Sequence, residues 1–133
     1  MRIYPAALLL LAIAGSAPAA PEIVSVRRIW DAGSHNAFTD LMRYKHKWIG
    51  TFREADAHVG GDGRSRVLEA TDGETWSPVG LVSEAGIDLR DPKLSIAADG
   101  RLMMVMGGSV YSAKTLLGRQ PRVSFSDDSR TWT

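Results

Sequence analysis

Ionisable side chains gather where an apolar, strand-like run ends in the first half of the chain. Arg53 and Glu54 close this run, and His58 and Asp62 follow in a loop rich in glycine. An arginine can hold a carboxylate through two parallel hydrogen bonds, a histidine exchanges protons near neutral pH, and a carboxylic acid can act as a general acid or base. These residue types indicate a loop suited to ligand binding and proton transfer.

Each of these residues also has a structural interpretation. Arg53 and Glu54 could form an exposed ion pair, which contributes little to stability. His58 could be a packed or solvated histidine, and Asp62 could belong to a hairpin turn of the sequence Gly-Gly-Asp-Gly.

The spacing of potential ligands indicates no metal site. The chain has no cysteine, and its three histidines are scattered along the sequence, at His35, His46 and His58. The loop set Asp56, His58 and Asp62 matches no recognised zinc or calcium spacing. We therefore predict no metal and no cofactor.

Two similar segments supply the elements that would position this loop, one from Phe38 to Trp76 and one from Leu89 to Trp132. Each reads as three short strands followed by an Asp-containing turn that ends in Thr-Trp. The offset between the copies is typical of a propeller blade of about 40 to 50 residues and four strands. The expected strands are Phe38–Met42, Lys47–Phe52, Ser65–Ala70 and Pro78–Val82 in the first copy, and Leu89–Leu94, Arg101–Met106 and Arg122–Phe125 in the second.

The second copy differs from the first at its end, because only Thr133 follows Trp132. We expect a complete first blade over about 37–83 and an incomplete second blade over about 87–133, with further blades needed to close a ring. Between strands, Ala113–Gly118 is predicted to form at most one helical turn.

The composition and the N-terminus bound the class of protein. Of 133 residues, 44% are hydrophobic and 23% charged, with a net charge of +1, so nothing indicates a nucleic-acid or anionic-membrane partner. Arg2, the apolar run 6–14 and the motif Ala17-Pro18-Ala19 predict a signal peptide over 1–19, cleaved after Ala19, with an uncleaved N-terminal anchor as the alternative. Either way, the mature domain is expected to be secreted or periplasmic.

The paired Thr-Trp turns resemble the Asp box of sialidase-like, BNR-repeat propellers, whose pattern is Ser-x-Asp-x-Gly-x-Thr-Trp, here one residue shorter. In such a turn the Asp accepts backbone N–H bonds, a Gly relieves a positive φ, and the Trp packs between sheets. The matching residues are Asp72, Gly73, Thr75 and Trp76 in the first turn and Asp128, Thr131 and Trp132 in the second. The resemblance covers most of the chain after about Ala37 and implies an all-β, six-bladed propeller.

The resemblance also implies a ligand site on the face opposite the Asp boxes. It suggests Asp62, His58 and Glu54 as catalytic residues and Arg53, Arg90, Asp91 and Asp40 as substrate-binding residues. Thr39-Asp40-Leu41 stands where the family has its first arginine, and Arg90-Asp91 is expected at the blade position of Thr39-Asp40.

The expected function is a glycoside hydrolase of the sialidase superfamily, which acts on terminal sugars of extracellular glycans through carboxylate acid/base chemistry. The alternative is a non-catalytic propeller that binds a glycan or a protein. A carbohydrate is therefore the expected ligand or substrate.

Overall fold

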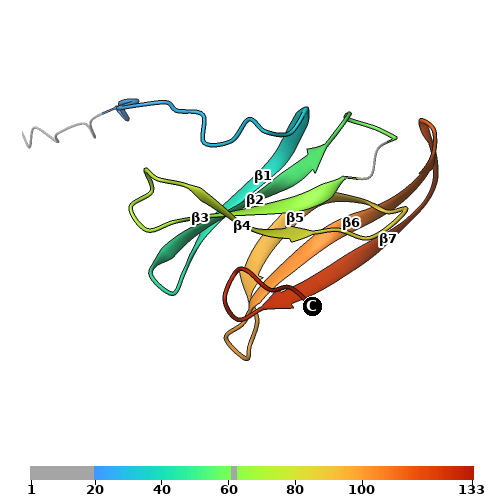
Figure 1. The fold of residues 1–133 in the computed structure, drawn as a ribbon. Helices are drawn as coiled ribbons and strands as arrows, with labels where there is room; N and C mark the ends of the chain where they lie inside the picture. The colour runs from blue at the N-terminus through green and yellow to red at the C-terminus, as the bar shows by residue number, and fades with distance from the viewer. Residues whose placement is uncertain (1–19, 61–62) are drawn as a thin grey trace, which may run out of the picture.

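The computed structural model describes residues 20–60 and 63–133, which fold into two antiparallel sheets. Sheet 1 has the order β1-β2-β3-β4 and sheet 2 the order β5-β6-β7, so each is a meander in which neighbours in sequence are neighbours in space. The bounds are β1 His35–Tyr44, β2 Lys47–Ala55, β3 Arg64–Ala70, β4 Ser77–Val82, β5 Asp88–Ile96, β6 Leu102–Ser112 and β7 Thr115–Ser126. Figure 1 shows the two sheets stacked face to face.

All strands expected from the sequence are present, and each expected run lies within a strand except for Arg101, which precedes β6. In the second copy, Ala113–Gly118 forms no helical turn, because β6 and β7 pair closely up to Ser112 and Thr115 around a tight turn. Gly107 and Gly108 lie inside β6, paired with Pro121 and Gln120.

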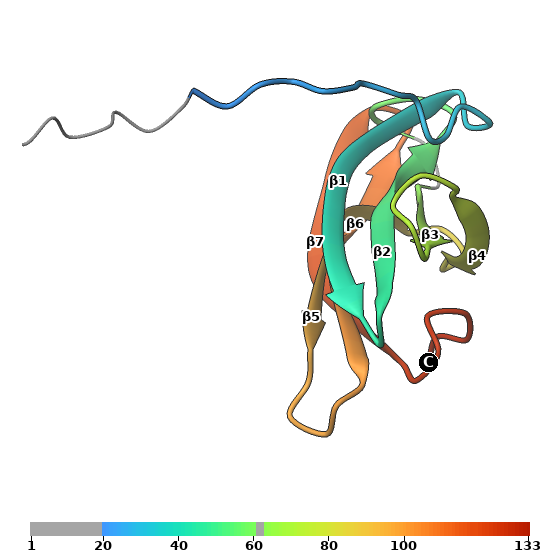
Figure 2. The same cartoon turned by 90° about the vertical axis from the view of Figure 1, so that its left-hand side faces the viewer.

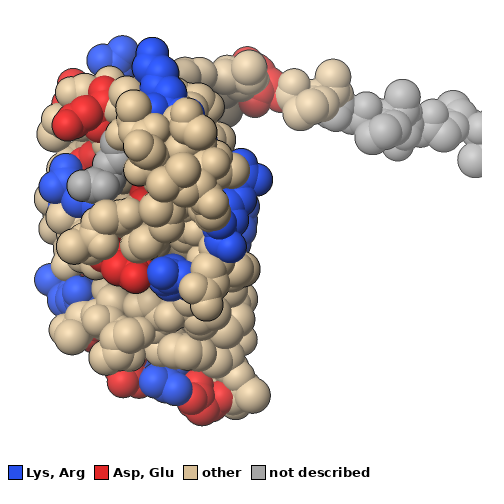
Figure 3. Space-filling view, turned by 90° about the vertical axis from the view of Figure 1, so that its right-hand side faces the viewer, with Lys and Arg blue, Asp and Glu red and all other residues tan. Residues whose placement is uncertain are grey.

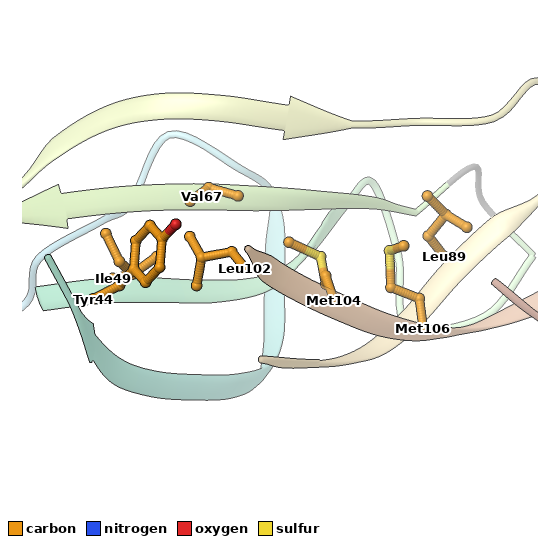
Figure 4. Close-up of a cluster of buried hydrophobic side chains, with 7 residues drawn as sticks. All are labelled: Tyr44, Ile49, Val67, Leu89, Leu102, Met104 and Met106. Carbon is orange, nitrogen blue, oxygen red and sulfur yellow. The ribbon is translucent and has the colours of Figure 1, made fainter. Parts of the chain in front are cut away.

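The core lies between the two sheets. Alternation along β6 turns Leu102, Met104 and Met106 toward sheet 1, with exposures of 0%, 0% and 2%. Tyr44, Ile49, Val67 and Leu89 complete this buried cluster (Figure 4). Burial of these apolar side chains holds the sheets together without disulfides.

The N-terminal segment, residues 20–34, belongs to neither sheet. It runs in an extended form across one end of sheet 1 before it enters β1 (Figures 1 and 2). Among the described residues, no helix is long and apolar enough to cross a membrane. The predicted signal peptide, residues 1–19, lies outside the described residues.

Candidate functional site

The connections gather at two opposite ends of the sheets (Figure 1). The β2–β3, β4–β5 and β6–β7 connections lie at one end, here called the loop end. The β1–β2 and β5–β6 turns and the two Asp-containing turns lie at the other, here called the turn end. Figure 3 views the loop end and shows acidic and basic side chains interspersed on it.

A buried ion pair joins the two sheets at the loop end. Arg53 at the end of β2 binds both carboxylate oxygens of Asp88 at the start of β5, with Nε–Oδ1 and Nη2–Oδ2 distances of 2.6 and 3.0 Å. Both side chains are almost completely buried, with exposures of 0% and 1%. A third donor of Arg53 reaches the carbonyl oxygen of Ala57 at 2.9 Å. Arg53 is therefore engaged within the protein and has no exposed surface to offer a ligand.

Arg90 extends this pair toward the surface. Its Nη1 donates to Asp88 Oδ2, the oxygen that also accepts from Arg53 Nη2, at 3.1 Å and to the carbonyl oxygen of His58 at 2.7 Å. Its guanidinium also lies 5.1 Å from the centre of the Phe38 ring, a cation–π contact. Two arginines thus share one carboxylate, so the group carries excess positive charge next to the β2–β3 loop.

Two histidines meet beside this group. Nδ1 of His58 in the loop lies 3.2 Å from Nε2 of His35 at the start of β1, and the rings pack edge to face. Phe38 packs against the His58 ring at 5.7 Å between centroids. These two histidines, 23 residues apart in the sequence, are thus adjacent in space. Among residues 20–60 and 63–133, no three His, Cys, Asp or Glu residues are grouped to hold a metal ion.

Glu54 follows Arg53 in sequence, but its side chain lies on the opposite face of sheet 1, because successive side chains of a strand point to alternate faces. Its carboxylate accepts hydrogen bonds from Arg66 at 2.9 and 3.2 Å, from Arg64 at 3.2 Å and from the indole of Trp30 at 2.9 Å. Burial alone would raise the pKa of Glu54, but the hydrogen bonds and charges of these partners outweigh it and lower the pKa. Glu54 is thus held as a carboxylate.

The remaining predicted site residues lie on β1 and β5, the first strands of the two sheets. Asp91 is exposed and has a φ of 49° within a β-bulge, a backbone conformation that L-residues other than Asn and Asp rarely adopt. Asp40 accepts the backbone N–H of Leu94 at 2.7 Å and thereby links the two strands. Asp62 lies outside the described residues.

The bulges correct the expected correspondence between the two copies. In β1 the bulge falls between Ala37 and Asp40, and in β5 it falls between Arg90 and Lys93. Arg90-Asp91 therefore occupies the position of Ala37-Phe38, and not that of Thr39-Asp40. The expected correspondence matched Asp40 with Asp91 by residue type, whereas the two bulges match Phe38 with Asp91, which share a positive φ of 62° and 49°.

The two Asp-containing turns have the hydrogen bonds expected of Asx-type turns. Asp72 Oδ1 accepts the N–H groups of Glu74 and Thr75, both at 2.8 Å, and Asp128 Oδ1 accepts those of Arg130 and Thr131 at 2.9 and 2.8 Å. Each closing tryptophan, Trp76 or Trp132, donates from Nε1 to a carbonyl oxygen of its own turn at 3.1 Å. Both carboxylates therefore act within their turns.

The structure thus brings Arg53, Arg90, His58 and Asp91 to the loop end and separates Glu54 from them by the thickness of the sheet. Sequence reasoning missed Asp88, His35 and Trp30. One signal was available in the sequence: side chains alternate along β2, which assigns Arg53 and Glu54 to opposite faces of sheet 1. The partners of these two residues depend on how the sheets and the N-terminal segment pack, which the sequence does not indicate.

No family model and no curated protein matches the chain. Among solved structures, the chain is similar to a protein of unknown function from Dyadobacter fermentans DSM 18053, with a TM-score of 0.60 and 20% sequence identity. The similarity covers 74% of this chain, which spans 35% of the length of that protein. At this identity the likeness supports the all-β fold and carries no information on function.

Proposed function

We propose that these two sheets are the first two blades of a six-bladed, sialidase-like propeller that hydrolyses terminal sugars of extracellular glycans. The observation that carries the proposal is the repeated pair of Asp-box turns at one end of consecutive meander sheets, with an arginine-rich group at the other end. In this fold the loops opposite the Asp boxes hold the ligand.

The outer face of sheet 2 supports a repeating architecture. When the two sheets are matched at their β-bulges, the strand register places Met103, Val105 and Val123 of sheet 2 at the positions of Ile49, Thr51 and Val67 of sheet 1. The sheet 1 residues are fully buried under sheet 2, whereas Val105 and Val123 are 37% and 51% exposed. A third sheet packed on this face would bury them in the same way, as a propeller requires.

Within the site, Arg90, His58 and Asp91 are the residues placed to meet a glycan. Arg90 and the histidine pair favour an acidic or polar sugar group by charge and hydrogen bonding, and the exposed Asp91 supplies a carboxylate. Arg53 and Asp88 hold the two blades in register behind them. Asp62 is the proposed general acid/base from the sequence.

The test is release of a fluorogenic sialoside, and of a panel of other glycosides, by the full-length protein. We expect Asp62→Ala to lower turnover by about 10²–10⁴-fold, the usual contribution of a general acid or base, and Asp91→Ala to lower it less. Asp72→Ala at the turn end is the matched control and should leave turnover intact. Release from another glycoside alone would change the sugar and keep the class.

The second candidate is a non-catalytic glycan-binding propeller. It is favoured by one observation: Arg53 and Glu54 are both buried and occupied by protein partners. Glycan binding by the full-length protein without release of any sugar would establish it and overturn the hydrolase.

A further inference from the structure

The β6–β7 hairpin is longer than its counterpart in sheet 1. When the two sheets are matched at their β-bulges, β2 ends at the counterpart of Ser109 and β3 begins at the counterpart of Gln120. By contrast, β6 continues to Ser112 and β7 begins at Thr115. Residues 110–119 therefore project at the loop end, beyond the positions that have a counterpart in sheet 1 (Figure 1).

The tip of this hairpin lies against the β2–β3 connection. A Cβ atom added to Gly60 would lie 2.3 Å from the carbonyl oxygen of Ala113, so the close approach of the two backbones requires a glycine. Pairing between β6 and β7 continues up to Ser112 and Thr115. The projecting segment is therefore a paired hairpin whose direction is fixed by sheet 2 below it and by the connection beside it.

The projecting hairpin exposes aliphatic side chains. Val110, Leu116 and Leu117 are 36%, 40% and 64% exposed. By strand alternation Val110 lies on the same face as Met106, the face toward sheet 1. Since sheet 1 is already in place, a further sheet on the opposite face of sheet 2 would not cover Val110. Leu117 is the extra residue of a bulge and has no partner in β6, so these side chains are available to a surface outside the fold.

The charge of the same hairpin is entirely positive. The strands β6 and β7 and the turn between them contain no Asp or Glu, although the chain has 15 such residues. Their basic residues are Lys114, Arg119 and Arg122. Arg122 pairs with Glu84, whereas Lys114 and Arg119 are exposed and belong to none of the ion pairs found among residues 20–60 and 63–133. The net charge of +1 for the whole chain averages out this local excess.

Exposed aliphatic side chains flanked by cations match the surface of an anionic bilayer, which has negative headgroups above an apolar interior. A bilayer also adapts its shape to a protruding tip, whereas a protein partner would have to supply a complementary surface. We propose that the β6–β7 hairpin docks on an anionic lipid surface, with Leu116 and Leu117 entering the headgroup region and Lys114 and Arg119 contacting lipid phosphates. This inference goes beyond the proposed function and does not depend on it.

The experiment measures co-sedimentation of the full-length protein with vesicles of phosphatidylcholine alone and of phosphatidylcholine mixed with phosphatidylserine. We expect binding to the mixed vesicles, and weaker binding as the salt concentration rises, because salt screens exposed charges. Lys114→Gln and Arg119→Gln should each weaken this binding about fivefold, the contribution of one basic residue near such a surface. Leu117→Ser should weaken it about tenfold, because the inserted apolar side chain is lost.

The matched controls lie at the turn end. Ile96→Ser removes an aliphatic side chain that is 53% exposed, and Arg43→Gln removes an exposed cation. Both variants should bind the mixed vesicles as tightly as the wild-type protein. The three hairpin variants should keep the wild-type melting temperature, because each replaces an exposed side chain outside the core.

The outcomes decide the proposal. Weaker vesicle binding in the hairpin variants, with unchanged binding in both controls, supports the docking surface. No binding of the wild-type protein to the mixed vesicles, equal losses in the controls, or binding that Leu117→Ser leaves unchanged overturns it. A loss of glycan or protein binding in the hairpin variants without vesicle binding assigns the hairpin to that partner and also overturns it. Cleavage of soluble glycosides tests the proposed function separately, so either proposal can fail while the other stands.

Discussion

The two ends of the molecule differ in how faithfully they repeat. At the turn end, the two copies are nearly identical: Gly73 and Ser129 share a positive φ, 77° and 68°, and each turn is held by one Asp and one Trp. At the loop end, equivalent positions hold different chemistry. By register, His35 corresponds to Asp88 and Arg53 to Gly107.

This difference indicates which end serves the scaffold. A turn that repeats its backbone geometry and its hydrogen bonds supports each sheet in the same way. An end whose charged residues are unique to each copy is free to build one site from both sheets. The variants below test this contrast through stability.

The largest effect is expected from Asp88→Ala. It leaves the fully buried Arg53 without a counter-charge, and breaking a buried ion pair from one side costs about 3–5 kcal/mol. Chemical denaturation of the wild-type and variant proteins measures the loss.

The control is the double variant Arg53→Met with Asp88→Leu, which removes both charges. Because well-packed apolar residues often replace a buried pair without cost, it should recover most of the stability. A double variant as unstable as Asp88→Ala would show that the pair holds the sheets by geometry and not by charge compensation.

Glu54→Gln is expected to have a smaller, pH-dependent effect. It replaces the charge-assisted hydrogen bonds from Arg66 and Arg64, each worth about 1.5–3 kcal/mol, by neutral ones worth about 0.5–1.5 kcal/mol, so we expect a loss of about 1–2 kcal/mol near neutral pH. Because the folded-state pKa of Glu54 is lowered, its contribution is present above the ordinary Glu pKa and is lost as the pH falls through the folded-state value. Stability curves of variant and wild type should therefore converge in acid.

Glu84→Gln provides the comparison at the same end. Glu84 pairs with Arg122 through two hydrogen bonds, at 2.6 and 3.0 Å, but its side chain is 44% exposed. Solvent screens such pairs, so the loss should be clearly smaller than for Glu54→Gln. Equal losses would contradict the importance of burial at Glu54.

The sequence predicts the features of this molecule that depend on local signals. Strands follow from alternating apolar residues, and the turn carboxylates follow from Asx-turn chemistry within four or five residues. The same locality explains why Asp72 and Asp128 could be assigned to the scaffold before the fold was known.

The partners at the loop end could not be predicted in this way. Arg53 meets Asp88 across 35 residues and His58 meets His35 across 23, because one sheet stacks on the other and the loop folds back on β1. Trp30 lies before the first strand, and only the path of the N-terminal segment brings it to Glu54. Non-local contacts of this kind have no signature in residue spacing.

The last contrast is at the turn end, at the position where the first turn has Gly73 and the second has Ser129. Gly73→Ala should cost about 1–2 kcal/mol, since an L-residue is disfavoured at positive φ. Ser129 already carries that cost, but its hydroxyl donates to Glu69 at 2.9 Å and the residue is buried. Ser129→Gly relieves the backbone and loses this bond to a charged acceptor, so we expect a net change within about 1 kcal/mol.

Ser129→Ala separates the two contributions, because it keeps the strained backbone and loses only the hydroxyl. Thermal denaturation of the three variants should show Ser129→Gly as the most stable. Ser129→Ala should be less stable than Ser129→Gly by the free-energy cost of a positive φ at a residue other than glycine. If Ser129→Gly were instead clearly more stable than the wild type, the bond to Glu69 would contribute less than the positive φ costs. The second turn would then be an imperfect copy of the first, and not a copy adapted to bind sheet 1.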